Sequence, residues 1–176
     1  MQEFSKQMKE GGEESLTSIS LAISILAVLV AMVTVMGHRT HTEAVLMQGK
    51  ATDQWNEYQA KKIRQESLAV VVDQMALQPT VDAKASAAKL AEYKAHIAKW
   101  DRDLEAGQDQ AKEFEAEVRH AEHQAVRFDL GEALLQISVV LSSITLFTRR
   151  RSFFFCGLTL GAVGVIIAAS AWLVPR

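Results

Sequence analysis

Three stretches without charged residues constrain the fold of this chain more than any other feature. They cover residues 15–37, 133–148 and 152–175. A helix rises about 1.5 Å per residue and the hydrocarbon core of a bilayer is about 30 Å thick, so roughly 20 apolar residues are needed to cross it. The first and third stretches are long enough, and the second becomes so when it is extended back to residue 129, with Asp129 and Glu132 at the headgroup boundary. The sequence therefore predicts three transmembrane helices, at 15–37, 129–148 and 152–175.

Composition indicates that the rest of the chain is helical as well. Only two of the 176 residues are proline, and β-branched residues are few outside the apolar stretches, which leaves little from which to build a sheet. Cys156 is the single cysteine, so the sequence offers no intramolecular disulfide and no cysteine-based zinc cluster. The predicted fold class is an all-α membrane protein.

Residues 38–128, between the first two spans, hold most of the charge and are rich in good helix formers. Pro79 divides this segment, because proline lacks an amide proton and disfavours helix at the preceding residue. In the second half, residues at spacings of three and four form an unbroken non-polar row, the heptad seam typical of coiled coils. The seam consists of Leu90, Tyr93, Ile97, Trp100, Leu104, Gly107, Ala111, Phe114, Val118, Ala121, Ala125 and Phe128. We predict a long antiparallel coiled-coil hairpin inserted between the first and second spans, with its turn near residues 79–81.

The first half of this hairpin has the same spacing but a polar middle. Its seam consists of Ala44, Met47, Ala51, Gln54, Tyr58, Lys61, Gln65, Leu68, Val72 and Met75. Polar seam residues reduce stability but fix the register or the oligomeric state. Two interpretations stand, a registry device or a recognition surface, for the group Gln54, Trp55, Tyr58, Lys61 and Gln65. If the hairpin pairs evenly about its turn, Trp55 faces Gly107, and the glycine leaves room for the indole ring.

Rows of small residues run along the first and third spans. The rows are Ser20, Ser24, Ala27, Ala31 and Thr34 in the first span, and Gly157, Gly161, Gly164, Ala168 and Ala171 in the third. Small residues let helix backbones approach closely in a membrane. We interpret the rows as packing faces within one three-helix unit. The alternatives are a subunit interface, or a polar pore lined by Ser20, Ser24, Gln136 and Ser143.

Four histidines flank the membrane-proximal end of the hairpin. They are His38, His41, His120 and His123, and imidazoles suit zinc, copper or nickel. Antiparallel pairing places His41 opposite His120. However, Val118 and Ala121 occupy the seam, so His120 and His123 project away from the opposite helix. The sequence therefore favours solvated histidines over a metal site or a pH-responsive interface, and no cofactor is expected.

Motifs for catalysis and for nucleic-acid binding are missing from the sequence. It has no glycine-rich phosphate loop, no serine elbow and no carboxylate pair suited to catalysis, so we predict no catalytic residues and no enzyme activity. Basic residues near the hairpin tip are diluted by Glu92 and Asp101, which argues against nucleic acid. Glu132 and Gln136, one turn apart at the start of the second span, are the polar residues best placed for ion handling.

Orientation depends on lysine and arginine near the membrane ends. These residues are equally numerous on the two sides, but residues 149–151 form a short loop made wholly of arginine, which is a strong retention signal. We expect the polar N-terminal tail, residues 1–14, and the 149–151 loop in the cytoplasm. The hairpin then lies outside.

Several motifs make the chain resemble a bacterial membrane-protein family described as domain of unknown function 4337. They are Gly37–His41, Asp53–Gln65, Leu146–Arg151 and the glycine row of the third span. The resemblance implies the same membrane topology and carries no activity. We therefore expect a non-enzymatic, homo-oligomeric scaffold or docking protein of the bacterial inner membrane, with a periplasmic or extracellular hairpin. Its expected partners are membrane lipid, further copies of itself and a protein that binds the hairpin. The alternative is an ion channel or an accessory subunit of a transport complex.

Overall fold

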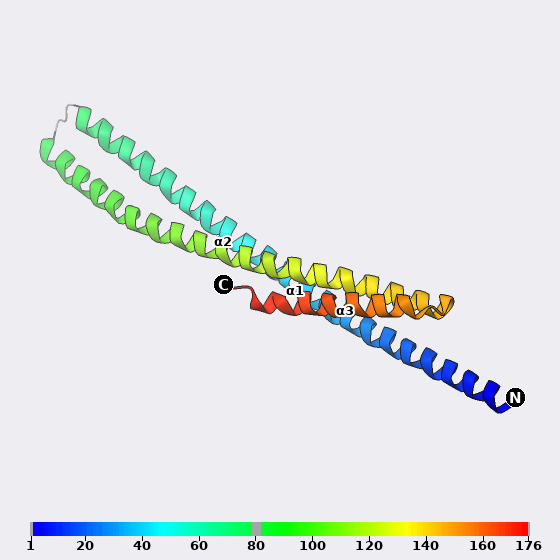
Figure 1. The fold of residues 1–176 in the computed structure, drawn as a ribbon. Helices are drawn as coiled ribbons and strands as arrows, with labels where there is room; N and C mark the ends of the chain where they lie inside the picture. Colours follow the sequence, from blue (N-terminus) through cyan, green and yellow to red (C-terminus); the bar gives the residue numbers. More distant parts are fainter. Residues whose placement is uncertain (1, 79–81, 176) are drawn as a thin grey trace. The chain divides into compact units, whose positions relative to one another are not determined.

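Helices make up nearly all of the structure, a computed structural model that describes residues 2–78 and 82–175, with side chains from Thr17 onward (Figure 1). The elements are α1 (Gln2–Leu77), α2 (Ala83–Thr148), α3 (Arg151–Ser170) and the short 3-10 helix η1 (Ala171–Leu173). The segment expected to be an N-terminal polar tail is helical from Gln2. The turn predicted near residues 79–81 lies outside the described residues.

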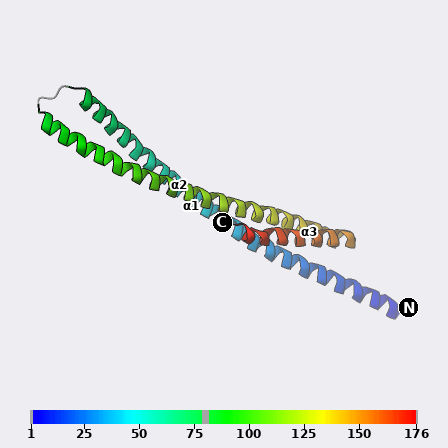
Figure 2. The same cartoon turned by 60° about the vertical axis from the view of Figure 1, so that its left-hand side comes forward.

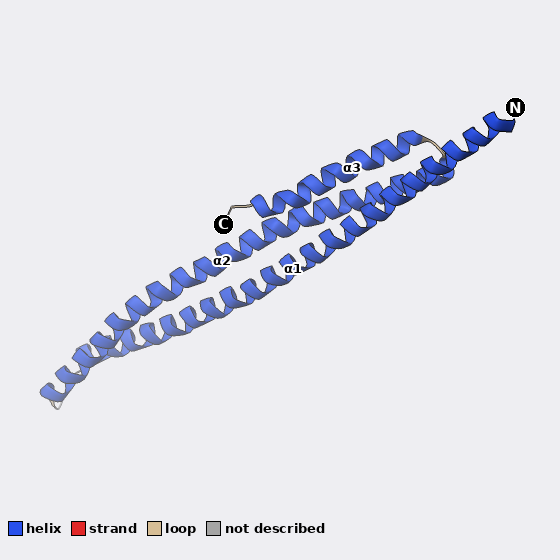
Figure 3. Cartoon of the chain, turned by 90° about the horizontal axis from the view of Figure 1, so that it is seen from below, coloured by secondary structure: helices blue, strands red, loops and turns tan. Residues whose placement is uncertain are grey.

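The prediction of an all-α protein is confirmed. The described ranges contain no strand, and only short connections interrupt the helices (Figure 3). Each of α1, α2 and α3 includes a segment long and apolar enough to cross a membrane. Length and composition thus agree with the predicted membrane location and with three spans.

Two compact units divide the chain, and both contain parts of α1 and α2. Unit 1 consists of Met1–Ala44 and Arg119–Arg176, and unit 2 consists of Val45–Val118. The three stretches without charged residues all fall in unit 1, whereas unit 2 is rich in charge.

A side-chain cap sets the start of α2, and the backbone conformation of two residues sets its end. Asp82 caps its start, because its Oδ1 atom accepts hydrogen bonds from the backbone N–H groups of Lys84 and Ala85, both at 3.0 Å. At the other end, Arg149 has a φ of 55°, in the left-handed region, and Arg150 is extended. The chain therefore leaves α2 and enters α3 over only two residues.

Heptad spacing decides which side chains are buried in unit 2. Every seam position from Met47 to Met75 in α1 and from Leu90 to Val118 in α2 is buried or half-buried. The contacts between the helices pair rising residue numbers in α1 with falling numbers in α2, since Gln54 contacts Gly107 and Gln65 contacts Ile97. The two segments of unit 2 thus run in opposite directions with their seams together.

In unit 1, α3 returns along α2, as two views show (Figures 1 and 2). An apolar cluster of Phe128, Ala168 and Ala171 connects these helices, and Val33 and Met36 of α1 pack against it. The core of unit 1 is therefore built from all three helices.

Candidate functional site

The glycine row of α3 lies against serines of α2. Gly157 is buried, and its carbonyl oxygen accepts a hydrogen bond of 2.6 Å from Ser138 Oγ. A Cβ atom added to Gly157 would lie 2.7 Å from Ser142 Oγ and 3.0 Å from the Ser138 carbonyl oxygen. Real Cβ atoms essentially never approach so closely, so the contact requires glycine.

Gly161 and Gly164 continue the same contact. A Cβ atom on Gly161 would meet Ser138 Oγ at 2.7 Å and Leu26 Cδ2 of α1 at 2.9 Å, and one on Gly164 would meet the Gly131 carbonyl oxygen at 2.9 Å. The structure thus places Gly157, Gly161 and Gly164 inside the three-helix unit of a single chain, where close backbone approach supplies the van der Waals contact that holds membrane helices together.

The small-residue row of the first span lies elsewhere. Ser20, Ser24, Ala27 and Ala31 are exposed in the single chain, whereas Ile19 and Leu26 on the other side of α1 are buried. The Ser24 hydroxyl donates to the Ser20 carbonyl oxygen at 3.0 Å, so its polarity is satisfied locally. This row therefore contributes little to packing within one chain.

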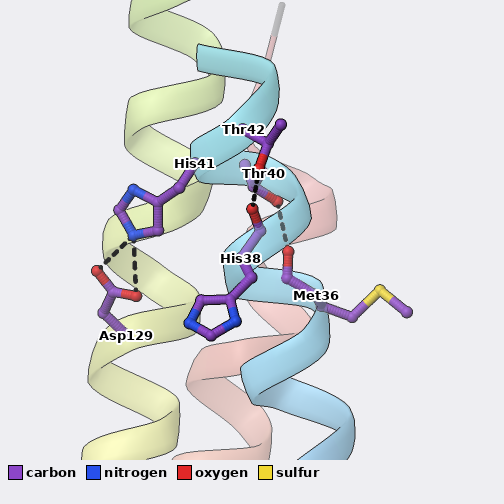
Figure 4. Close-up of polar contacts among 6 residues, drawn as sticks. All are labelled: Met36, His38, Thr40, His41, Thr42 and Asp129. Carbon is purple, nitrogen blue, oxygen red and sulfur yellow. Dashed lines mark hydrogen bonds and ion pairs between the residues drawn. The ribbon is translucent and has the colours of Figure 1, made fainter. Parts of the chain in front are cut away.

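A histidine–aspartate contact joins α1 to α2 shortly after the end of the small-residue row of α1. The Nε2 atom of His41 lies 3.2 Å and 3.0 Å from the two carboxylate oxygens of Asp129, and about half of each side chain is exposed (Figure 4). Gly37 lies one turn along α1, and a Cβ atom there would be 3.6 Å from Asp129 Oδ1. His38 projects beside the pair from the next turn of α1 (Figure 4).

The four histidines are not brought together. His41 contacts Asp129, whereas His120 Nδ1 lies 3.0 Å from the carbonyl oxygen of Pro175. The expectation that His41 faces His120 is therefore wrong, because His41 meets α2 at a position closer to the second span. His38 and His123 are exposed. Among the described residues, no group of three or more His, Cys, Asp or Glu side chains could hold a metal ion.

The polar seam residues of unit 2 have partners on the opposite helix or on their own. Gln54 Nε2 donates to the Gly107 carbonyl oxygen at 3.5 Å, and Gln65 Nε2 donates to the Ile97 carbonyl oxygen at 3.4 Å and to Asp101 Oδ1. Trp55, Tyr58 and Lys61 make further contacts. Trp55 Nε1 donates to Glu115 Oε1 at 2.8 Å, the Trp55 and Tyr58 rings meet edge to face at 5.5 Å, and Lys61 Nζ lies 2.6 Å from Glu57 Oε1.

Gly107 does not accommodate the indole ring. The contact within 4 Å of a Cβ atom placed there is Gln54 Nε2 at 3.5 Å, an ordinary van der Waals distance. The expectation that Trp55 fills the space over Gly107 is therefore wrong by one residue in register, since the neighbouring Gln54 occupies it and the indole turns toward Glu115. The role of these residues in fixing register stays a prediction.

Comparison with known proteins identifies the family. The family described as "Domain of unknown function (DUF4337)" matches residues 15–174. The chain belongs to this family. No curated protein and no solved structure matches the chain significantly. Membership in DUF4337 confirms the resemblance found in the sequence.

Two further polar contacts lie in unit 1 of this DUF4337 chain. Gln136 Nε2 donates to Glu132 Oε1 at 2.8 Å along α2, and Arg127 donates to Ser170 Oγ of α3 at 2.8 Å. The sequence singles out the first pair by its spacing of one helical turn. The second depends on how α3 returns along α2, for which the sequence holds no local signal.

Proposed function

We propose that this DUF4337 protein is a non-enzymatic, homo-oligomeric scaffold or docking protein of the bacterial inner membrane. The three spans anchor it, and the helical hairpin of residues 38–128 binds a partner outside the membrane. The arginine loop at 149–151 supports a cytoplasmic N-terminus and a periplasmic or extracellular hairpin, because arginine-rich short loops are retained in the cytoplasm.

One observation carries this proposal. Ile63, Val70 and Leu77 lie seven residues apart on α1, and 63%, 56% and 84% of their surfaces are exposed. The seam passes through Gln65, Leu68 and Val72, so these three residues occupy the outermost heptad position, which a solvated helix normally fills with polar residues. A line of apolar side chains on a charged, water-exposed unit is typical of a protein interaction site.

The contacts within unit 2 would suit such a role. Gln54 and Gln65 contact backbone carbonyl groups of the opposite helix, and Trp55 donates to Glu115. Directional contacts of this kind specify one register, because a slip between the helices would separate each donor from its acceptor. The outer apolar line would then be presented in one fixed arrangement.

A channel or transport accessory remains the second candidate because of Glu132 and Gln136. An ionisable side chain bonded to an amide at the start of a span is a feature of ion pathways. The two hypotheses predict different behaviour of the full chain.

The test places a photo-reactive amino acid at Ile63 or Val70 of the full chain in its native membrane. Matched controls carry it at Gln59 or Glu66, which are exposed polar positions on the same helix. A docking arm should give several-fold more protein adduct from positions 63 and 70 than from the controls. Equal yields at all four positions would contradict the proposal. Ion flux through liposomes that contain the purified chain, above that of protein-free vesicles, would favour the channel instead.

A further inference from the structure

The side of unit 1 away from α3 carries an unusual set of polar groups. On α2, the residues in contact with α3 include Arg127, Gly131 and Ser138. The buried row of Phe128, Leu135 and Ser142 runs along the middle of the helix. At 3.5 residues per turn, Gly131 and Ser138 lie on one side of this row. The other side of the row carries the polar residues Asp129, Glu132, Gln136 and Ser143.

On α1, the same side carries the row of small and polar residues. Leu26 meets Gly161 of α3, and Val33 and Met36 pack against the cluster of Phe128, Ala168 and Ala171. The opposite flank holds Ser20, Ser24, Ala27, Ala31, Thr34, His38 and His41. We call the two rows together the open face. The contact between His41 and Asp129 joins them, so both rows lie on one side of the α1–α2 pair.

The open face differs from the remaining exposed surface of the spans. Around the rest of α1, the exposed side chains between residues 21 and 35 are large and apolar, namely Leu21, Ile25, Val28, Met32 and Val35. Those side chains suit lipid. The Gln136 amide, one turn deeper than Glu132, would face hydrocarbon there, which is unfavourable, because polar groups in spans normally face protein or water. The open face therefore needs a cover other than lipid.

Donors and acceptors on the open face lie at matching depths. Asp129 contacts both His41 and the Gly37 position, which fixes the level of α1 against α2. His38 is three residues deeper than His41, and Glu132 is three residues deeper than Asp129, about 4.5 Å in each case. His38 and Glu132 therefore lie within about one turn of the same level. The His38 imidazole has no hydrogen-bond partner among the described residues, whereas Glu132 accepts from Gln136 and keeps further acceptor capacity.

We propose that the open face is the contact with a second copy of this chain, in which His38 of each copy pairs with Glu132 of the other. A two-fold axis along the membrane normal keeps every residue at its own depth, so a two-fold interface requires complementary groups at one level on one face. The open face meets this requirement, with histidine on α1 and carboxylate on α2. The small residues Ser24, Ala27 and Ala31 let the helices of the two copies approach closely.

This inference rests on the homo-oligomeric state in the proposed function and names the surface that produces it. The test uses the full chain with Cys156→Ser, since Cys156 is exposed and would react. Two differently tagged chains, one with His38→Cys and one with Glu132→Cys, are co-expressed, and native membranes are treated with a short bifunctional thiol reagent. The matched control pair is Val35→Cys with Leu130→Cys, two exposed positions at similar depth outside the open face.

The expected result is at least a several-fold higher yield of the mixed cross-link for His38→Cys with Glu132→Cys than for the control pair. Equal or reversed yields would overturn the proposed face. The mass of the uncross-linked chain in lipid nanodiscs tests the homo-oligomeric state independently of the proposed interface. An oligomer with the wrong cross-links refutes the face alone, whereas a monomer refutes the homo-oligomeric function as well. Glu132→Leu should raise the monomer fraction several-fold, and an unchanged oligomer in this variant would also overturn the pairing.

Discussion

His41 of α1 and Asp129 of α2 lie 3.0 Å apart, and they connect segments separated by 88 residues of sequence. His41 follows the first uncharged stretch of the chain, and Asp129 precedes the second. Because about half of each side chain is exposed, the solvent screens the pair, and the contact contributes little to the free energy of folding. Its main effect is to align α1 with α2.

A double-mutant cycle on this contact should therefore give a small coupling. We expect His41→Ala, Asp129→Ala and the double variant to show a coupling of about 0.2–1 kcal/mol, the range of exposed ion pairs. The measurement is the free energy of unfolding of the full chain in detergent. A coupling well above this range would show that the pair is more desolvated than its exposure indicates.

Replacing Gly157 by alanine should destabilise unit 1. The new Cβ atom would lie 2.7 Å from Ser142 Oγ and 3.0 Å from a backbone oxygen, and overpacking of this kind costs about 1–3 kcal/mol. The matched control is Gly49→Ala, where nothing lies within 4 Å of the new atom. That change should stabilise α1 by about 1 kcal/mol, since alanine is the better helix former. Thermal melting of both variants checks the two signs, and a stabilised Gly157→Ala variant would contradict the close packing of α2 and α3.

Gly107→Ala should stabilise the protein, in contrast to Gly157→Ala. The new Cβ atom meets Gln54 Nε2 at an ordinary 3.5 Å, so the gain in helix propensity of about 1 kcal/mol is not offset by a clash. Thermal melting is the measurement, with and without Trp55→Ala. Because the indole is bonded to Glu115, the effect should be the same in both backgrounds. If the effect of Gly107→Ala depended on Trp55, the result would instead support the predicted packing of the indole over Gly107.

Replacing Lys61 and Gln65 together by leucine should raise the melting temperature and broaden the distribution of oligomers. Both side chains are half-buried at seam positions, and the hydrogen bond from Gln65 to the Ile97 carbonyl oxygen is long, at 3.4 Å. Apolar seam residues add stability, and polar ones restrict the assembly. Gln59→Leu, at an exposed position, is the control. A lower melting temperature with an unchanged assembly would show that the contact with Asp101 outweighs the gain from burial.

The exposed pair Lys89 and Glu92 should make a weak contribution over the neutral range of pH. Their side chains lie 2.7 Å apart, the Glu92 carboxylate raises the pKa of Lys89, and Lys89 lowers the pKa of Glu92. The stability that comes from the lowered pKa of Glu92 is present above the ordinary pKa of that group and is lost as the pH falls through the lowered value. The stability that comes from the raised pKa of Lys89 is present below the ordinary pKa of that group and is lost as the pH rises through the raised value. NMR titration of Lys89→Gln should return the Glu92 pKa toward its ordinary value, and no return would remove the pairing as the cause.

The helical architecture could be read from the sequence because its determinants are periodic. Uncharged length specifies the spans, and the spacing of three and four from Leu90 to Val118 marks the positions that are buried or half-buried in unit 2. Individual contacts were harder to predict. Counting outward from the turn places Gln54 and Gly107 within one residue of their observed contact, but it misses the pairing of His41 with Asp129. Small departures from ideal pairing accumulate with distance from the turn, and long side chains such as Trp55 reach along the helix.

The two-residue connection between α2 and α3 has a consequence for the order of folding. The bond between Ser138 and Gly157 joins residues 19 positions apart, whereas the contact of His41 with Asp129 spans 88. Loops of shorter sequence separation close at a smaller entropic cost. The first span is synthesised before the others, yet it should be the last to find its partners, because it must wait for α2 and α3 to form the surface onto which it docks.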